Sequence, residues 1–208
     1  MDDSKTLVIV DVQKDFYHPE GALYVPGGEK VIPAIKKYIE DNKNSIKKIV
    51  FTVDWHPYNH CSFKENGGIW PRHCVQYTEG ASLPNELIAA AMQTCVNEYG
   101  DYYFHVVKKG TLSDKEEYGA FSLLSVSHYD EANSTIYCCH SDIEIDTNEI
   151  VICGLALDYC VYETLKALYK AGPEFHFSLL KDGCACIGGE EKEKEIYEAL
   201  IRKGVNII

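Results

Sequence analysis

The sequence has little of what marks membrane, secreted or nucleic-acid-binding proteins. Its apolar runs, such as residues 7–10 and 150–153, are short enough for a strand, and none is long enough to cross a bilayer. The first five residues carry no basic region followed by an apolar segment, so we expect no secretory leader. The formal net charge is −12, which argues against nucleic acid and anionic membranes as partners because both require basic patches.

Cysteine is abundant, but the patterns of a disulfide framework or a zinc knuckle are missing. The nine cysteines are an odd number at irregular spacing, and no C-x-x-C pair occurs. We therefore expect reduced thiols and a cytoplasmic protein. The motif Cys184-Ala185-Cys186 is a weak metal or redox signal, and we favour the interpretation that it places small residues in a core. The sequence assigns no role to the pair Cys138-Cys139.

A regular alternation of strand and helix patterns is present. The length of 208 residues suits one domain, residues 1–208, and the 46% of hydrophobic residues supports a sizeable core. Apolar and β-branched runs predict six strands, at residues 6–10, 48–53, 103–108, 150–153, 174–180 and 205–208. Residue spacing and punctuation predict helices at residues 31–39, 86–92, 121–126, 158–170 and 190–203. This order predicts a three-layer α/β/α fold around a six-stranded, mostly parallel sheet.

Two polar stretches interrupt the alternation. The first runs from residue 54 to about residue 84 and is rich in His, Pro, Gly, Asn and aromatic residues. A loop of this length in a compact domain is usually functional. The second, residues 127–148, is polar and irregular, and we expect an insertion or an extended hairpin near an edge of the sheet.

Polar residues follow three of the predicted strands, where an open parallel sheet binds its ligands. Asp11 follows the first strand and can serve there as a general base, although taken alone it is more simply interpreted as a loop or cap aspartate. Lys109 follows the third strand and can hold an anionic partner or stabilise a thiolate. Because neighbouring strand residues face opposite sides, we expect one of Lys108 and Lys109 to be a solvated charge, and the resemblance described below favours Lys109 as the functional residue.

Cys160 lies in a turn between the fourth strand and the helix predicted after it. Free amides and the dipole at a helix N-terminus lower the pKa of a thiol and stabilise a developing oxyanion. A buried structural cysteine is the usual alternative, and Cys153, inside the strand, keeps that interpretation. The position of Cys160 favours a nucleophile.

A candidate metal site begins where the second strand ends. Asp54 and His56 are two residues apart, so strand alternation puts them on one side, and His73 lies further along the same loop. One carboxylate and two imidazoles, with coordination positions left open, suit zinc, iron or manganese in a site that accepts a ligand.

Other interpretations of these residues remain open. His60 is a further candidate ligand in the same loop. A structural zinc site that uses Cys61 and Cys74 is less favoured, because structural sites prefer paired and closely spaced ligands. A metal-stabilised binding module would need no acid, base and thiol at three strand ends. A thiol redox protein would need a resolving cysteine that can reach Cys160.

The sequence resembles the nicotinamidases of the isochorismatase-like cysteine hydrolase superfamily. The resemblance spans residues 7–161 and is specific, because the motifs occur together and in the family's order. It is carried by residues 11–16 (DVQKDF), 54–57 (DWHP) with His60 and Ser62-Phe63, 70–76 (WPRHCVQ), 109–111 (KGT), 118–121 (YGAF) and 154–161 (GLALDYCV). Residues 127–148 look longer and more polar than the family requires.

The resemblance implies hydrolysis of a carboxamide, nicotinamide, at a cysteine nucleophile, with one divalent metal ion as cofactor. It implies a catalytic triad of Asp11, Lys109 and Cys160. It implies a metal ion bound by Asp54, His56 and His73. It also implies a pyridine cradle formed by Phe16, Trp70, Tyr118 and Ala156, an oxyanion site at the amides of Ala156 and Cys160, and a non-proline cis peptide before Ala156. Zinc is the expected ion, with iron and manganese as alternatives, and a homo-oligomer is one of the assembly states that the sequence leaves open.

Overall fold

A six-stranded parallel sheet forms the centre of the computed structural model, which describes residues 4–96, 104–121, 126–130, 135–138, 143–147, 149–172 and 175–208. The strand order is β3-β2-β1-β7-β8-β9, and every pairing is parallel. The strands are β1 Lys5–Val10, β2 Ile46–Asp54, β3 Phe104–Lys109, β7 Glu149–Gly154, β8 His176–Cys184 and β9 Asn206–Ile207. The six predicted strands are confirmed, and the sheet they form is parallel throughout.

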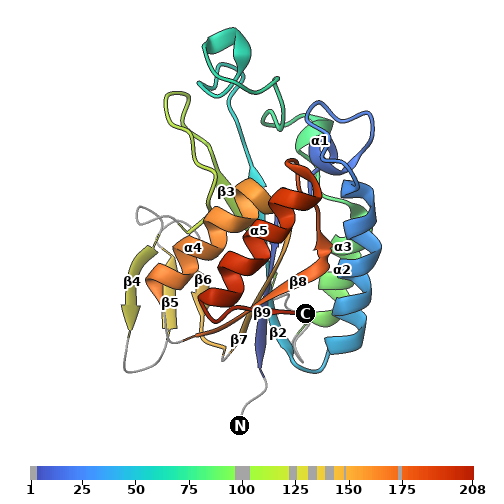
Figure 1. The fold of residues 1–208 in the computed structure, drawn as a ribbon, viewed down its shortest axis with the longest axis vertical. Helices are drawn as coiled ribbons and strands as arrows, with labels where there is room; N and C mark the ends of the chain where they lie inside the picture. The colour runs from blue at the N-terminus through green and yellow to red at the C-terminus, as the bar shows by residue number, and fades with distance from the viewer. Residues whose placement is uncertain are drawn as a thin grey trace.

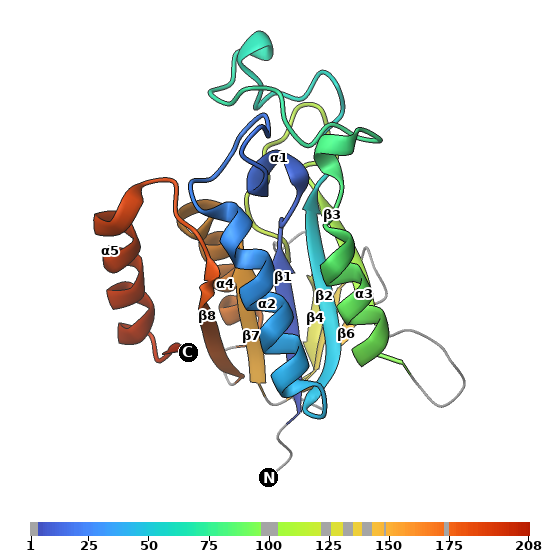
Figure 2. The ribbon, with the colours of Figure 1, turned by 90° about the vertical axis from the view of Figure 1, so that its right-hand side faces the viewer.

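Helices cover both faces of this sheet, as Figures 1 and 2 show. One face packs against α2 (Gly28–Asn42) and α3 (Asn85–Thr94), and the other packs against α4 (Tyr162–Ala171) and α5 (Gly189–Arg202). Side chains alternate along β1 and so contribute to the hydrophobic cores on both faces of the sheet. Leu7 and Ile9 face the α2–α3 side, and Val8 and Val10 face the α4–α5 side. A strand buried on both faces therefore reads as one continuous apolar run.

The polar segment after residue 126 forms a second, antiparallel sheet. Its strands are β4 (Val126–Asp130), β5 (Thr135–Cys138) and β6 (Ile143–Ile145), in the order β4-β5-β6. The sheet lies beside α4 (Figure 1). Ile145 is fully buried in the same core as α4 and α5, so β6 helps to cover that face of the central sheet. The predicted extended hairpin is thus part of a three-stranded unit.

Three local features differ from the sequence prediction. The helix predicted at residues 121–126 is not seen at its two ends: Phe121 is a bend with φ +60°, and Val126 begins β4. Residues 122–125 between them lie outside the described part of the chain, as do Cys139, Tyr103 and Glu174. A short helix, α1 (Lys14–Tyr17), was not predicted. The helix predicted from residue 158 begins instead as the π-helical turn η3 (Leu157–Val161).

The register of the sheet brings the functional strand ends together. Val10 pairs with Thr52 on one side and with Gly154 on the other, and Asp54 pairs with Lys109. The loop of residues 55–84, which includes two short 3-10 turns, η1 (Lys64–Asn66) and η2 (Glu79–Ala81), extends above these ends at the top of Figure 1. Among the described residues, no helix combines the length and the apolarity that crossing a membrane would require.

We expect Phe51→Ala to lower the free energy of unfolding by about 3–5 kcal/mol, because the ring is fully buried between β2 and the α2–α3 layer and meets Phe104 edge-on at 6.0 Å. Urea denaturation measures this change. Leu112→Ala is the control, since Leu112 is 56% exposed and its truncation should change stability by about 0.5 kcal/mol or less. Equal losses in the two variants would contradict this description of the core.

Candidate active site

The ammonium group of Lys109 is the centre of a buried polar cluster at the strand ends. Its Nζ lies 2.8 Å from Asp11 Oδ2 and 2.5 Å from Asp54 Oδ1, and it donates to Cys160 Sγ at 3.4 Å. Burial alone would lower the pKa of Lys109, but the charges of Asp11 and Asp54 outweigh it and raise that pKa well above its usual value. Lys109 is therefore a permanent cation, whereas Lys108 points outward, where its ammonium lies 4.5 Å from the centre of the Trp55 ring.

The two carboxylates beside Lys109 are in different electrostatic states. Burial raises the pKa of Asp11, although Lys109 and the hydroxyl of Thr52, which donates to Asp11 Oδ1 at 2.7 Å, oppose the shift. Burial also raises the pKa of Asp54, but the charges of Lys109, His56 and His73 outweigh burial and lower that pKa. A pair of carboxyl groups whose pKa values are pushed apart is a common basis for dividing acid–base work from charge stabilisation.

Cys160 lies in the π-helical turn η3 and is 6% exposed. The carboxylate oxygens of Asp11 and Asp54 and Cys160 Sγ all lie within 4.8 Å of one another. Burial raises the pKa of the Cys160 thiol well above its usual value, and the nearby carboxylates add to this shift although Lys109 opposes it. The thiol is thus protonated in this environment, which differs from the expectation of a thiolate at a helix N-terminus and makes a neighbouring base necessary. Asp11, whose Oδ2 pairs with Lys109 at 2.8 Å, also has a carboxylate oxygen within 4.8 Å of Cys160 Sγ, so it is placed to take the proton of the thiol.

The turn before Cys160 depends on Gly154 at the end of β7. Gly154 has φ +124°, and a Cβ there would lie 2.0 Å from the carbonyl oxygen of Val10. Glycine alone permits this close approach of β7 to β1. The Leu155–Ala156 peptide bond that follows is cis, as the family resemblance implies. The Ala156 N–H has no acceptor in the described part of the chain and belongs to the wall of the cavity below.

A second cluster next to Lys109 has the composition of a metal site. His56 Nε2 and His73 Nε2 lie 3.5 and 3.9 Å from Asp54 Oδ2. His56 Nδ1 lies 3.0 Å from the carbonyl oxygen of Gly110, and His73 Nδ1 lies 2.7 Å from that of Pro71. Because a carbonyl only accepts, both Nδ1 atoms donate, so in the neutral rings it is the Nε2 atoms, on the side of the Asp54 carboxylate, that carry the lone pairs. Asp54, His56 and His73 are therefore oriented to hold a metal ion.

The alternative metal ligands are engaged elsewhere. His60 lies near His56 and Glu116, but its Nε2 donates to the carbonyl oxygen of Lys115 at 2.9 Å and its Nδ1 accepts from the Ser62 hydroxyl at 2.7 Å. Its ring stacks on His56 at 4.1 Å between centroids, so it holds that imidazole in place. Neither Cys61 nor Cys74 joins a group of converging donors among the described residues.

Both clusters contribute residues to the lining of one cavity, which is partly open to solvent. The four residues predicted to bind substrate all line it, together with the nucleophile candidate and two of the metal donors; these seven are Phe16, Trp70, Tyr118, Ala156, Cys160, Asp54 and His73. The Trp70 indole N–H donates to the Tyr118 hydroxyl at 3.0 Å, which fixes the two rings relative to each other. The sequence did not single out the other lining residues, which are Leu23, Val25, Glu116, Tyr159 and Ile187.

Gln13 is a buried residue of the site that sequence reasoning missed. Its side-chain oxygen accepts from the Asp54 N–H at 2.8 Å, and its amide nitrogen donates to the carbonyl oxygens of Asp54 at 2.8 Å and Ala81 at 3.0 Å. These three bonds fasten the end of β2 to the end of β1 and to the long loop. The only sequence signal was a glutamine two residues after a strand-end aspartate.

The fold and the site define a three-layer α/β protein in which an Asp–Lys–Cys cluster adjoins an Asp–His–His donor set. The chain belongs to the isochorismatase family, whose domain matches residues 5–122. A nicotinamidase of Saccharomyces cerevisiae is 31% identical over 229 residues, which cover 98% of this chain and 99% of that relative.

Two solved structures are similar over nearly the whole chain. A pyrazinamidase of Pyrococcus horikoshii in complex with zinc is 34% identical with a TM-score of 0.72, and the match covers 99% of this chain and 98% of that one. The protein PnC1 from L. infantum in complex with nicotinate is 27% identical with a TM-score of 0.73, and the match covers 100% of this chain and 93% of that one.

Gly110, next to Lys109, offers a test of the metal donor set. It has φ +60°, and a Cβ there would lie 2.4 Å from Cε1 of the His56 ring. We expect Gly110→Ala to turn the imidazole away and to lower the zinc affinity of the purified protein roughly tenfold or more, because displaced supporting contacts have effects of that size. Metal content after equilibration with a competing chelator measures the change.

Gly67→Ala is the matched control. Gly67 has φ +91°, but nothing lies within 4 Å of its Cβ position. It should lose about 1–2 kcal/mol of stability from the left-handed backbone alone, with zinc affinity unchanged. Unaltered zinc binding in Gly110→Ala would show that His56 is not held in the described orientation.

Proposed function

We propose that this chain is a nicotinamidase, which hydrolyses nicotinamide to nicotinate and ammonia and so returns the pyridine ring to NAD synthesis. The observation that carries the proposal is the position of Lys109, which contacts Asp11, Cys160 and Asp54 at once. A nucleophile, its base and a metal donor thereby meet at one cavity lined by aromatic residues. The similarity to nicotinamidases over almost the full length supports the choice of substrate.

In the proposed reaction, Cys160 Sγ attacks the carboxamide carbon while its proton passes to Asp11. The oxyanion that forms is held by the backbone amides of Ala156 and Cys160. Asp11 returns the proton to the amide nitrogen, the C–N bond breaks, and ammonia leaves behind a thioester. Asp11 then takes a proton from water, which attacks the thioester and releases nicotinate and the thiol. Lys109 balances the negative charge on Asp11 and Cys160 through both halves of the reaction.

The proposed cofactor is one divalent metal ion held by Asp54, His56 and His73, with zinc favoured and iron or manganese as alternatives. Two imidazoles and one carboxylate suit zinc, and the similar pyrazinamidase was solved in complex with zinc. When bound, the ion would supply a Lewis-acidic position for the pyridine ring nitrogen. The chain itself would orient the ring through Phe16, Trp70 and Tyr118, which all line the cavity with Cys160, and so bring the carboxamide to the thiol.

Two rival functions explain fewer of these contacts. A general amidase on the same fold needs no donor set facing the cavity. A thiol redox protein needs a resolving cysteine, but Cys153 lies in the core on the α2–α3 face of the sheet, whereas Cys160 belongs to the core of the α4–α5 face. We place the enzyme in the cytoplasm, a compartment consistent with the seven free cysteines found among the described side chains. Its assembly state is left to measurement.

We expect Cys160→Ala to lower the rate of ammonia release from nicotinamide by roughly four orders of magnitude or more, because no other thiol in the described part of the chain meets both Asp11 and Lys109. A coupled ammonia assay on purified protein measures the rate. Cys153→Ala is the matched control: it removes a fully buried thiol, and it should cost about 1–3 kcal/mol of stability but retain turnover. Retention of half the activity in Cys160→Ala would refute the cysteine mechanism.

We also expect chelation of the metal, or His56→Ala, to abolish nicotinamide hydrolysis while the protein stays folded, because the donor set is proposed to orient substrate and not to hold the fold together. Benzamide, which has the same shape without the ring nitrogen, should be a poor substrate even of the metal-loaded enzyme. Ammonia release and circular dichroism are the two measurements. Equal activity on both amides would indicate a general amidase, and unfolding on chelation would indicate a structural metal site.

A further inference from the structure

One wall of the cavity comes from a segment to which no role has been given. Ile187 lies between β8 and α5, beyond the residues matched by the isochorismatase domain, and it lines the cavity that holds Cys160. It is 37% exposed, which makes it the most exposed of the lining residues, whereas Phe16, Ala156 and Cys160 are 5%, 5% and 6% exposed. Ile187 therefore stands at the mouth of the cavity, and the nucleophile lies at its base.

The side chain of Asp158 holds this segment in place. Asp158 Oδ1 accepts from the Ile187 N–H at 3.1 Å, and Oδ2 accepts from the Gly188 N–H at 2.9 Å. The Leu157 N–H donates to the carbonyl oxygen of Ala185 at 2.8 Å. Asp158 also puts its negative charge at the start of α5, where the helix dipole is favourable to it. Three bonds thus join the turn that carries Cys160 to the segment that carries Ile187.

The chemistry of the substrate decides which part of it faces Ile187. In nicotinamide the carboxamide is on C3, so the ring edge at C2 lies between the carboxamide and the ring nitrogen. In the proposed reaction the carboxamide meets Cys160, and the ring nitrogen lies toward the metal donors Asp54 and His73. All three residues are buried, so the C2 edge of the ring faces the base of the cavity. C5 is directly opposite C2, so it points away from these residues and toward the open end of the cavity, where Ile187 lies.

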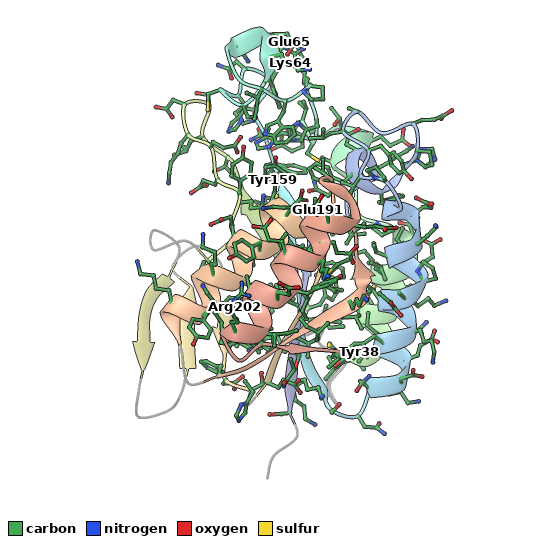
Figure 3. The ribbon with its side chains drawn as sticks, in the orientation of Figure 1. Tyr38, Lys64, Glu65, Tyr159, Glu191 and Arg202 are labelled. Carbon is green, nitrogen blue, oxygen red and sulfur yellow. The ribbon has the colours of Figure 1, made fainter. Side chains whose placement is uncertain are left out.

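We propose that Ile187 is a specificity-determining residue that limits the size of the substituent at C5 of the pyridine ring, and that Asp158 is the positioning residue that holds Ile187 there. This inference rests on the proposed nicotinamidase function. The bonds to Asp158 hold the backbone of Ile187 at the mouth, and a β-branched side chain has few χ1 rotamers through which it can move aside for a larger ring. Figure 3 labels one residue in each of the two elements concerned, Tyr159 in η3 and Glu191 in the first turn of α5.

The test compares nicotinamide with 5-methylnicotinamide. Wild-type enzyme should discriminate against the methylated amide, and Ile187→Ala should raise the ratio of kcat/KM for 5-methylnicotinamide over nicotinamide roughly tenfold, the effect expected of room for one methyl group. Ile187→Phe should lower the same ratio. Ile201→Ala, which truncates an isoleucine that is 58% exposed on α5, is the control and should leave the ratio unchanged. Calorimetric binding of 5-methylnicotinate should shift in the same direction as the kinetics.

Asp158 is tested by Asp158→Asn, in which an amide NH₂ replaces one of the two accepting oxygens. The ratio of kcat/KM for 5-methylnicotinamide over nicotinamide should move toward that of Ile187→Ala. The double variant of Asp158→Asn with Ile187→Ala should have the same ratio as Ile187→Ala alone, because displacing residue 187 has no further effect once its side chain has been truncated. Glu191→Gln is the control, since it removes an exposed carboxylate from the first turn of α5, the helix that follows Ile187, and leaves the bonds of Asp158 in place. Additive effects, or equal losses on both amides, would overturn the positioning role.

The two hypotheses fail in distinguishable ways. If the wild-type enzyme releases no ammonia from nicotinamide, the proposed function is wrong. If it does, and the ratio for Ile187→Ala equals that of the wild type, the function stands and the role of Ile187 is refuted.

Discussion

The buried ammonium of Lys109 is the interaction on which the arrangement of the site depends. Asp11 and Asp54 bring two carboxylates to adjacent strand ends, both almost free of solvent contact. Two buried carboxylates repel each other and lose their hydration. One cation between them offsets the repulsion and the desolvation only if the ammonium is held at a well-determined position relative to both. The parallel register supplies that geometry, because Asp54 pairs with Lys109 while Val10, just before Asp11, pairs with Thr52. The same ammonium also donates to the thiol of Cys160 at 3.4 Å and to the carbonyl oxygen of Glu117 at 3.3 Å.

Much of this arrangement was predictable from the sequence. Continuous apolar runs are recognisable because a strand covered on both faces has no polar side, as in β1 and β7, which are buried over five of their six residues. Once a parallel sheet is inferred, the residues after its strands must meet at one edge, so Asp11, Asp54 and Lys109 could be grouped without knowing any contact. Alternation indicated that only one of Lys108 and Lys109 faces the site, and the family resemblance favoured Lys109. The histidines could be grouped because they share a loop with Asp54.

The remaining features depend on tertiary contacts that leave no local pattern. Gln13 is distinguished only by bonds to Asp54 and Ala81, residues 41 and 68 positions away. The environment of the Cys160 thiol could not be inferred from its position at a helix start, because burial and two carboxylates from other strand ends raise its pKa against the opposing charge of Lys109. The polar strands β4 to β6 gave a weak periodic signal, and the contribution of Ile145 to the core depends on a packing partner, α4, that comes later in the chain.

The π-helical turn η3 connects catalysis with the selection of substrate. The same five residues carry Cys160 at one end and Asp158 near the other, and Asp158 holds the segment before α5. The position of the nucleophile and the width of the cavity mouth are therefore set by one rigid element, but by different side chains. Substitutions at the mouth leave the contacts among Asp11, Lys109 and Cys160 in place, because those contacts lie at the base and come from other strand ends. A scaffold of this kind keeps one chemistry while its loops alter which carboxamide is admitted, which is how functional sites commonly diverge on a shared fold.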